Sequence, residues 1–516
     1  MLKKILIANR GEIARRVIFT CREMGIETVA VYSDADKAGI HVIEADEAVR
    51  LGTSEPSESY LNIDSIIKAA QKTGADAIHP GYGFLAENAD FARRCENEKI
   101  IFIGPPAEVI EKLGDKTVAR QIMSKGGVPV IPGMLESESD FKIIAQKASE
   151  IGYPVLIKSA AGGGGKGMRV VASFEEMEEA CVSASSEAAA AFGSSAIYLE
   201  KYIDQSRHVE FQILCDQHKN AIHLNERECS IQRRHQKIIE ETPSIALTPE
   251  LRDEMGKAAV AAAIASGYVN AGTVEFLLGP DNSFYFLEVN TRLQVEHPIT
   301  EMTTGIDLVR RQIMIAAGQP MGIAQEDVKA RGHAIECRIY AEDPENDFFP
   351  SPGTIEYLKE PSGPGIRNDC GIYQGCTVPM EYDPILSKLV CYAEDRQSAV
   401  KKMIRALNDY VISGIKTPIP FLVDILKSQP FESGQTYTDF INAHFKDWKP
   451  ASYNAENPSN ANNMKNAENK ADSDIAACIA YIADELCGRP ETKALGTASK
   501  EAGFATPWQT LGSWNR

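Results

Sequence analysis

Short apolar runs alternate with amphipathic stretches along the first hundred residues. The pattern predicts a buried strand over residues 5–8, a helix over 12–24, and further strands at 28–32 and 100–104. Strands that alternate with helices form parallel sheets with helices on both faces. We therefore expect an N-terminal α/β domain over residues 1–114, with ligands beyond the carboxyl ends of its strands.

The pattern changes after this first domain. Residues 115–331 contain a glycine cluster and strands of alternating apolar and polar residues, which predict an α+β domain with an antiparallel sheet. Residues 332–446 mix strands with helices and predict a second α+β domain. The final segment, 447–516, begins with a polar stretch (452–471) typical of a linker.

The composition argues against several classes of protein. Of 516 residues, 54 are Lys or Arg and 72 are Asp or Glu, a net charge of -18 that argues against general nucleic-acid binding. No apolar run approaches the roughly 20 residues that span a bilayer, so we expect a cytoplasmic protein without a membrane span. The 11 cysteines include no CxxC pair, which favours reduced thiols over a metal framework.

Four consecutive glycines mark the most conspicuous motif, followed by Lys166 and Gly167. Such a run leaves backbone N–H groups free to approach an anion. A Walker A loop is excluded, because Gly167 stands where that motif needs Ser or Thr. Lys158 ends the preceding predicted strand, so the segment indicates a phosphate clamp in a mobile lid over residues 132–203. The alternative is a flexible surface loop.

A second motif is a predicted hairpin around the turn residues 280–283. Centring the turn between Asp281 and Asn282 places Glu275 opposite Glu288. Two facing carboxylates repel and favour a cation between them, and oxygen ligands suit Mg²⁺. Asn290 lies on the same face, two residues beyond Glu288. The alternative is a solvated charged face, and a one-residue bulge would disturb the register.

A row of polar side chains follows this hairpin. Arg292, Gln294 and Glu296 alternate and are expected to continue the face of Glu288 and Asn290. The nearby segment 233–237 adds further cations. A guanidinium, an amide and a carboxylate in one row predict a small-anion site with a base.

Together these motifs identify a family. From residue 1 to about 445 the sequence resembles biotin carboxylases of the ATP-grasp superfamily. The resemblance rests on the glycine cluster and on residues 7–14 (IANRGEIA), 79–88 (HPGYGFLAEN), 234–237 (RHQK), 287–298 (LEVNTRLQVEHP) and 336–343 (ECRIYAED).

The resemblance implies ATP-dependent activation of bicarbonate to carboxyphosphate, followed by carboxylation of biotin. It implies two Mg²⁺ or Mn²⁺ ions held by Glu275, Glu288 and Asn290. The residues that it assigns to ATP are Lys116, Lys158, Gly163, Gly164, Gly165, Lys166, Gly167, Glu200, Lys201, Ile203, His208, Gln232, His235 and Leu277.

The resemblance also assigns the chemical steps. Glu296 matches the base that deprotonates bicarbonate, and Arg338 matches the group that stabilises the biotin enolate. Tyr82, Tyr382 and Asp383 fit the region of the biotin ring. The bicarbonate pocket is matched by Lys237, Arg292, Gln294 and the backbone of Val295.

The expected partner proteins are inferred from segments that this sequence does not contain. No Ala-Met-Lys-Met biotinyl segment is present, so biotin is expected on a separate carrier protein, beside a carboxyltransferase subunit. We expect a homodimer or a larger hetero-oligomer. The final acceptor is expected to be acetyl-CoA or another acyl-CoA, as in fatty acid biosynthesis. The alternatives are a two-subunit pyruvate carboxylase, a different ATP-grasp ligase and a noncatalytic scaffold subunit; the last two are disfavoured by the intact site residues.

The end of the chain falls outside the resemblance. Residues 474–486 place Ile475, Ile479 and Ile482 on one apolar stripe of a short helix, which is marginal alone. Trp508 and Trp514 follow, and tryptophan is a common interface anchor. The hypothesis is a docking segment for the partner subunits; the alternative is a helix that folds back on its own domain.

Overall fold

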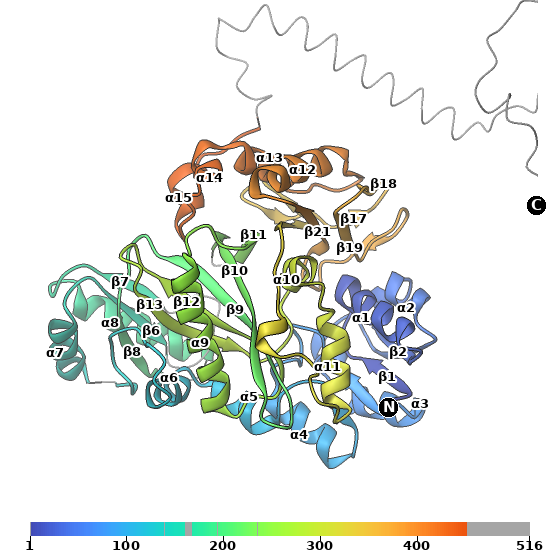
Figure 1. Cartoon of the computed structure of the whole chain (residues 1–516), viewed down its shortest axis with the longest axis horizontal. Helices are drawn as coiled ribbons and strands as arrows, with labels where there is room; N and C mark the ends of the chain where they lie inside the picture. The colour runs from blue at the N-terminus through green and yellow to red at the C-terminus, as the bar shows by residue number, and fades with distance from the viewer. Residues whose placement is uncertain (1, 139, 160–167, 193–194, 235, 451–516) are drawn as a thin grey trace, which may run out of the picture. The chain divides into compact units, whose positions relative to one another are not determined.

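The computed structural model describes residues 2–138, 140–159, 168–192, 195–234 and 236–450 (Figure 1). The predicted glycine loop with Gly163, Gly164, Gly165, Lys166 and Gly167, the predicted contact His235 and the predicted docking segment lie outside the described residues. The described residues up to Trp448 cluster into one compact unit.

The N-terminal part of the chain forms a parallel sheet. Its strands lie in the order β3 (Glu47–Gly52), β2 (Glu27–Ser33), β1 (Lys4–Ile7), β4 (Ala77–His79) and β5 (Ile101–Phe102). The accompanying helices are α1 (Gly11–Glu23), α2 (Ile40–Glu44), α3 (Ile63–Thr73), α4 (Ala89–Asn97) and α5 (Ala107–Gly114). Ile5, Leu6 and Ile7 are fully buried, as in a strand covered on both faces. The predicted α/β fold of this region is confirmed.

An eight-stranded antiparallel sheet forms the centre of the molecule. Its strands lie in the order β13 (Phe284–Asn290), β12 (Asn270–Leu278), β9 (Arg207–Cys215), β10 (Ala221–Arg233), β11 (Gln236–Thr242), β14 (His333–Tyr340), β21 (Ile385–Ala393) and β19 (Ile366–Cys370). The helices of the middle region are α6 (Lys116–Lys125), α9 (Pro249–Ser266), α10 (His297–Thr304) and α11 (Leu308–Ala316). Helix α9 lies over β9 and β10 in Figure 1 and packs against both.

A smaller antiparallel sheet lies within the predicted lid. Its strands are ordered β7 (Arg169–Val171), β6 (Val155–Ser159) and β8 (Ile197–Lys201), with helices α7 (Phe141–Ile151) and α8 (Met177–Phe192). Met134, Ile157, Met177 and Leu199 belong to a hydrophobic cluster that is separate from that of the central sheet. The lid therefore has its own core.

The C-terminal region completes the α+β architecture. Its helices are α12 (Arg396–Asp409), α13 (Ile419–Lys427), α14 (Gln429–Glu432) and α15 (Phe440–His444). Three short strand pairs join β15 (Glu342–Asp343) to β16 (Phe349–Pro350), β17 (Gly353–Thr354) to β20 (Thr377–Val378), and β18 (Tyr357–Lys359) to β22 (Val411–Ser413). Helix α12 packs on β21, which makes a shared hydrophobic cluster with β14.

Contacts between these regions are extensive. The central sheet spans the predicted domain boundary at residues 331/332. Strand β11, which precedes this boundary in the chain, pairs with β14, which follows it. Helix α1 contacts α11, β19 and β21, so it joins the N-terminal region to both others. The division at residues 114/115, 331/332 and 446/447 stays a prediction. In the part of the chain that the structure describes, no helix combines the length and apolar character needed to cross a membrane.

Candidate active site

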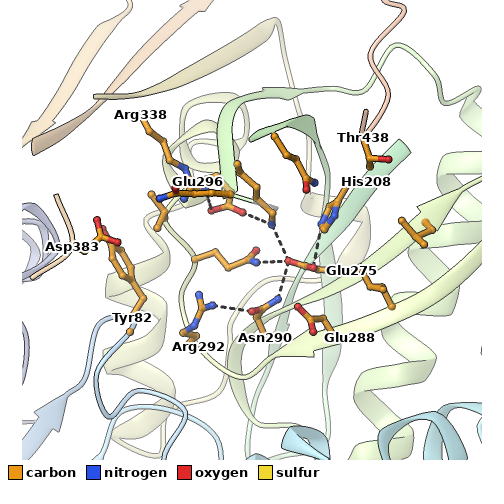
Figure 2. Close-up of a pocket in the computed structure, with 18 of the residues that line it drawn as sticks. Tyr82, His208, Glu275, Glu288, Asn290, Arg292, Glu296, Arg338, Asp383 and Thr438 are labelled. Atoms are coloured by element: carbon orange, nitrogen blue, oxygen red, sulfur yellow. Dashed lines mark hydrogen bonds and ion pairs between the residues drawn. The ribbon is translucent and has the colours of Figure 1, made fainter. Parts of the chain in front are cut away.

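One cavity of about 820 Å³ lies where these regions meet (Figure 2). It is bordered by loops that follow β1 and β4, by the lid strands, and by the polar face of the central sheet. The described residues predicted from the sequence all line it: Tyr82, Lys116, Lys158, Glu200, Lys201, Ile203, His208, Gln232, Lys237, Glu275, Leu277, Glu288, Asn290, Arg292, Gln294, Val295, Glu296, Arg338 and Asp383.

The β12–β13 hairpin brings Glu275 opposite Glu288, as the sequence predicted. The predicted centre of the turn is wrong, however. Leu278 pairs with Phe284, which centres the turn on Asp281, whose Oδ1 accepts hydrogen bonds from the N–H and hydroxyl of Ser283. A bulge next to Glu275 then shifts the register by one residue and restores the predicted carboxylate pair. The shifted turn centre and the bulge therefore compensate each other, so that Glu275 still faces Glu288.

Glu275 is fixed by four polar neighbours. Its Oε1 accepts hydrogen bonds from Lys237 Nζ (2.8 Å), Asn290 Nδ2 (2.9 Å) and Gln294 Nε2 (2.8 Å). Its Oε2 lies 3.1 Å from His208 Nε2. Burial favours the neutral acid, yet Lys237 and His208 hold the pKa of Glu275 well below its usual value. Glu275 is therefore an anion held in one orientation.

Glu288 contrasts with its cross-strand partner. Within the residues that the structure describes it makes no hydrogen bond or ion pair, and its carboxylate stands apart in Figure 2. Burial, and next the charge of Glu275, raise the pKa of Glu288 above its usual value. A half-buried carboxylate beside another carboxylate, without an ion-pair partner among the described residues, fits a metal ligand.

Lys237 connects three carboxylates. Its ammonium lies 2.5 Å from Glu210, 2.8 Å from Glu275 and 2.7 Å from Glu296. Burial alone would lower the pKa of Lys237, but these three anions raise it well above the usual value. Arg227, fully buried, holds Glu210 from the other side at 2.7 Å. The lysine is thus a fixed cation at the centre of the cavity wall.

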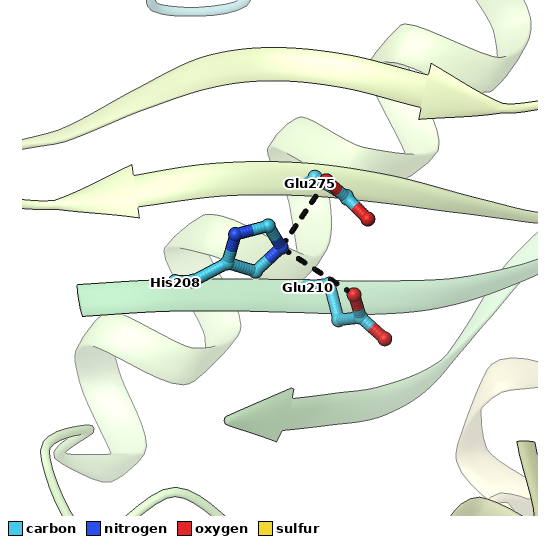
Figure 3. Close-up of side chains that lie close together, drawn as sticks. All are labelled: His208, Glu210 and Glu275. Carbon is cyan, nitrogen blue, oxygen red and sulfur yellow. Dashed lines mark ion pairs between the residues drawn. The ribbon is translucent and has the colours of Figure 1, made fainter. Parts of the chain in front are cut away.

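Glu210 was missed by sequence reasoning. The signal was present in the predicted strand, where His208, Glu210 and Gln212 alternate with apolar residues and so share one face. His208 Nε2 lies 3.1 Å from Glu275 and 3.6 Å from Glu210 (Figure 3). Burial disfavours the protonated form of His208, but the two glutamates raise its pKa to about 9. His208 is therefore a cation between carboxylates, which does not suit a metal ligand.

Glu296 joins the anion row to Arg338. Its Oε1 accepts a hydrogen bond from Lys237, and its Oε2 accepts one from Arg338 Nη2 at 2.9 Å (Figure 2). Burial would raise the pKa of Glu296, but Lys237 and then Arg338 keep it below the usual value. Arg338 is also held by Glu240, whose Oε1 accepts from Nε at 2.6 Å. The arrangement provides an ionised base flanked by two cations.

Arg292, Gln294 and Glu296 do not continue the strand face of Glu288 and Asn290, as the sequence had led us to expect. Strand β13 ends at Asn290, because the next N–H, that of Thr291, donates to a Glu87 carboxylate oxygen (3.1 Å) instead of a neighbouring strand. The side chains nevertheless converge on the cavity. Arg292 is oriented by Glu87 (Nε, 2.9 Å) and Asn290 (Nη2, 2.9 Å). The row is built by a loop.

Cations line the end of the cavity near the lid. Lys158 Nζ lies 2.5 Å from Glu200, which is also bound by the buried Arg120. Burial lowers the pKa of Lys116. The ammonium of Lys201 donates to the backbone carbonyls of Gly152 and Tyr153, so only the rest of this residue is available to a ligand. Lys158 and Lys116 are thus the described lysines of this end that fit phosphate oxygens.

Aromatic rings border the end near Arg338. Tyr82 and Asp383 both line the cavity, and the Tyr82 hydroxyl has no hydrogen-bond partner among the described residues. Tyr382 lines the cavity too, but its hydroxyl donates to Ser33 (2.6 Å) and so fixes this loop to the N-terminal region. Tyr340, which sequence reasoning missed, lines the wall 3.5 Å from Arg338. This end accepts a flat, partly apolar group.

Comparisons with known families cover nearly all of the described chain. Residues 1–110 match the family described as "Biotin carboxylase, N-terminal domain". Residues 115–324 match "Carbamoyl-phosphate synthase L chain, ATP binding domain". Residues 336–443 match "Biotin carboxylase C-terminal domain".

Similar individual proteins agree with these matches. A pyruvate carboxylase subunit of Methanothermobacter thermautotrophicus is 53% identical over 86% of this chain and 90% of its own. Biotin carboxylase 1 of Bacillus subtilis is 52% identical over 86% of this chain and 99% of its own length. A similar solved structure is the biotin carboxylase domain of Hydrogenobacter thermophilus 2-oxoglutarate carboxylase, a dimer with MgADP, ADP and bicarbonate. It superposes with a TM-score of 0.83 at 48% identity and covers 86% of this chain and 98% of its own. The chain belongs to the biotin carboxylase family, the ATP-dependent ligases that serve as subunits of biotin-dependent carboxylases.

Proposed function

We propose that this cavity carboxylates biotin with bicarbonate and ATP, through carboxyphosphate. The observation that carries the proposal is the double pairing of Glu296 with Lys237 and Arg338, in the same cavity as the facing Glu275 and Glu288. A base, two cations and a carboxylate pair are what bicarbonate activation beside a nucleotide requires.

The nucleotide binds at the lid end. Lys116 and Lys158 meet its phosphates, while Ile203 and Leu277 supply apolar surface to the base. Glu275, Glu288 and Asn290 would hold Mg²⁺, or Mn²⁺ in its place, two ions in all. The half-buried carboxylate of Glu288, which has no partner among the described residues, fits this role. When bound, the metal neutralises charge on the phosphate oxygens.

Bicarbonate binds between Lys237 and Arg292, with Gln294 and the backbone of Val295. Its negative charge competes with Glu296 for Lys237, one of the two cations that now hold this carboxylate. Glu296 then accepts the bicarbonate proton, and the oxyanion attacks the γ-phosphorus as the bond to ADP breaks. Because the pKa of Glu296 is low, the base is already ionised before bicarbonate arrives.

Biotin binds at the aromatic end, between Tyr82, Asp383 and Arg338. Carboxyphosphate breaks into CO₂ and phosphate, and the phosphate accepts the N1′ proton of biotin. Arg338 stabilises the enolate oxygen by its fixed charge and keeps its own protons. The enolate nitrogen then forms the bond to CO₂.

We further propose that the biotin is carried by a separate carrier protein and that a carboxyltransferase subunit passes the carboxyl group to acetyl-CoA or another acyl-CoA. Relatives named as pyruvate carboxylase and as biotin carboxylase are 53% and 52% identical, so pyruvate is the second candidate acceptor. A homodimer is proposed by similarity to the dimeric domain from Hydrogenobacter. Reconstitution with each carboxyltransferase distinguishes the two acceptors.

The direct test uses the purified full chain with ATP, Mg²⁺, radiolabelled bicarbonate and free biotin. We expect ADP release that requires bicarbonate and accelerates with biotin, together with acid-labile label on biotin. ADP release without any dependence on bicarbonate, or without labelled biotin, would contradict the proposal.

A further inference from the structure

Arg338 is anchored from behind by a carboxylate that does not line the cavity. Glu240 on β11 accepts a hydrogen bond from the Nε of Arg338 at 2.6 Å. This bond leaves Nη2 to contact Glu296 at 2.9 Å. Since Glu296 is proposed to accept the bicarbonate proton and so to lose its charge, Glu240 remains as the lasting anion beside the guanidinium throughout turnover.

A second glutamate lies next to this anchor. Glu336 on β14 is directly opposite Glu240 across the strand pair, and it precedes Arg338 by two residues, so all three share one face. Glu240 is 1% exposed and Glu336 is fully buried. The opposite face carries Ile239, Cys337 and other members of a hydrophobic cluster. The two carboxyl groups therefore lie side by side in the interior.

The partners of these two groups differ. The described residues offer no hydrogen-bond partner to either oxygen of Glu336, or to the second oxygen of Glu240. The charged groups that act on Glu336 are Arg338 on its own strand, Glu240 on β11, Lys388 on β21 and Glu296 before α10. Glu240, in contrast, forms a direct ion pair with the guanidinium of Arg338.

Two buried carboxylates at a facing pair do not both ionise when a single cation binds only one of them. Burial and the charge of Glu240 raise the pKa of Glu336 well above its usual value. Burial also raises the pKa of Glu240, to about 7, against the opposing effect of Arg338. Geometry and charge thus agree on which group keeps its proton.

We propose that Glu240 is the positioning residue of Arg338 and acts as an anion, while Glu336 beside it is a permanently neutral acid. The division matters because a second anion behind the guanidinium would offset the positive charge that biotin needs. Glu240 aims the Nη atoms into the cavity, and the neutral Glu336 leaves their charge available. This inference rests on the proposed carboxylation of biotin.

The two glutamates provide a matched pair of variants. Glu240→Gln removes the anion with almost no change of shape. We expect kcat/KM for free biotin to fall on the order of 10- to 100-fold, because a hydrogen bond between charged groups is lost. The KM for ATP and the slow bicarbonate-dependent ATP cleavage without biotin should change less than about threefold. A general loss of packing would lower all of these rates together.

Glu336→Gln replaces a neutral acid by a neutral amide of the same shape. We expect kcat/KM for biotin to stay within about threefold of the wild type, and the double variant to match Glu240→Gln alone. A loss in Glu336→Gln equal to that in Glu240→Gln would overturn the proposal, as would an unchanged kcat/KM for biotin in Glu240→Gln. A wild type without biotin-accelerated turnover would instead overturn the proposed function.

Infrared spectroscopy keeps the proposal testable even if Glu240→Gln does not fold. At neutral pH, the difference spectrum of the wild type minus Glu336→Gln is expected to contain the carbonyl band of a buried protonated carboxyl group. Absence of that band from the difference spectrum of the folded variant would overturn the assignment of the proton.

Discussion

The two ends of the cavity differ in how their charges are paired. At the anion end, Lys237, Glu296 and Arg338 form a continuous series of ion pairs on or beside the central sheet. At the nucleotide end, Lys158 pairs with Glu200, but Lys116 and Glu288 have no hydrogen bond or ion pair within the described part of the chain. Paired groups are already oriented for chemistry, whereas unpaired ones await a charged ligand. Substitutions at the first end should therefore lower the rate, and at the second end the affinity.

The largest effect is expected at the anion end. Glu296→Gln removes the base but keeps the shape of the side chain, so bicarbonate-dependent ATP cleavage is expected to fall about 10²–10⁴-fold. Binding of ADP, measured by calorimetry, is expected to change less than about threefold, because Glu296 pairs with Lys237 and Arg338 and with none of the described residues of the lid.

The control for this variant is Glu326→Gln, which changes an exposed side chain remote from the cavity. It should match the wild type in both measurements. Turnover of Glu296→Gln at the wild-type rate would show that another group is the base.

A smaller effect is expected at the nucleotide end. Glu288→Gln removes the carboxylate that has no cation of its own, so the Mg²⁺ concentration for half-maximal activity is expected to rise at least about tenfold. The KM for bicarbonate should change little. The matched control is Glu250→Gln in the exposed first turn of α9. Equal Mg²⁺ dependence in Glu288→Gln and the control would exclude Glu288 as a ligand.

The same two ends also differ in how well sequence predicted them. The Glu275–Glu288 pair was predicted from the strand period and the turn, and it is present although the turn centre was wrong. The bulge that corrects the register lies between β12 and β13, since β12 pairs with β9 without a shift, and it cannot be derived from the turn residues. A local pattern was sufficient for the pair because both residues belong to one hairpin.

Long-range partners could not be predicted in this way. Glu240 anchors Arg338 although 98 residues separate them in the chain. Glu87 orients Arg292 across 205 residues. Which buried carboxylate meets which guanidinium is decided by how strands far apart in the sequence pair, as β11 does with β14. The parallel sheet and the central strands were predictable from periodicity, while the ion-pair network required the fold.

The lid allows a second test of the nucleotide end. Its separate hydrophobic core allows β6, β7 and β8 to move together against the central sheet. Binding of a non-hydrolysable ATP analogue with Mg²⁺ is expected to slow amide exchange in β6 and β7 about tenfold, while β1 and β2 serve as the internal control. Equal exchange with and without the saturating analogue would argue against closure.

The smallest effect on catalysis is expected beyond the described residues. Trp448 packs on Phe421, with ring centroids 5.0 Å apart, and its Nε1 donates to Asp424 at 2.8 Å. A chain ending at Phe445 is therefore expected to lose about 1–3 kcal/mol of stability, seen as a lower Tm. A chain ending at Pro450 keeps this contact, so its Tm and its carboxylation of free biotin should stay close to the full chain's values.

The chain that ends at Pro450 also tests the docking hypothesis. If residues 451–516 dock the carrier or carboxyltransferase, this truncated chain will capture those subunits less well in pull-downs than the full chain. Undiminished capture would show that the docking hypothesis is wrong, and lost free-biotin activity would show that these residues support the catalytic core.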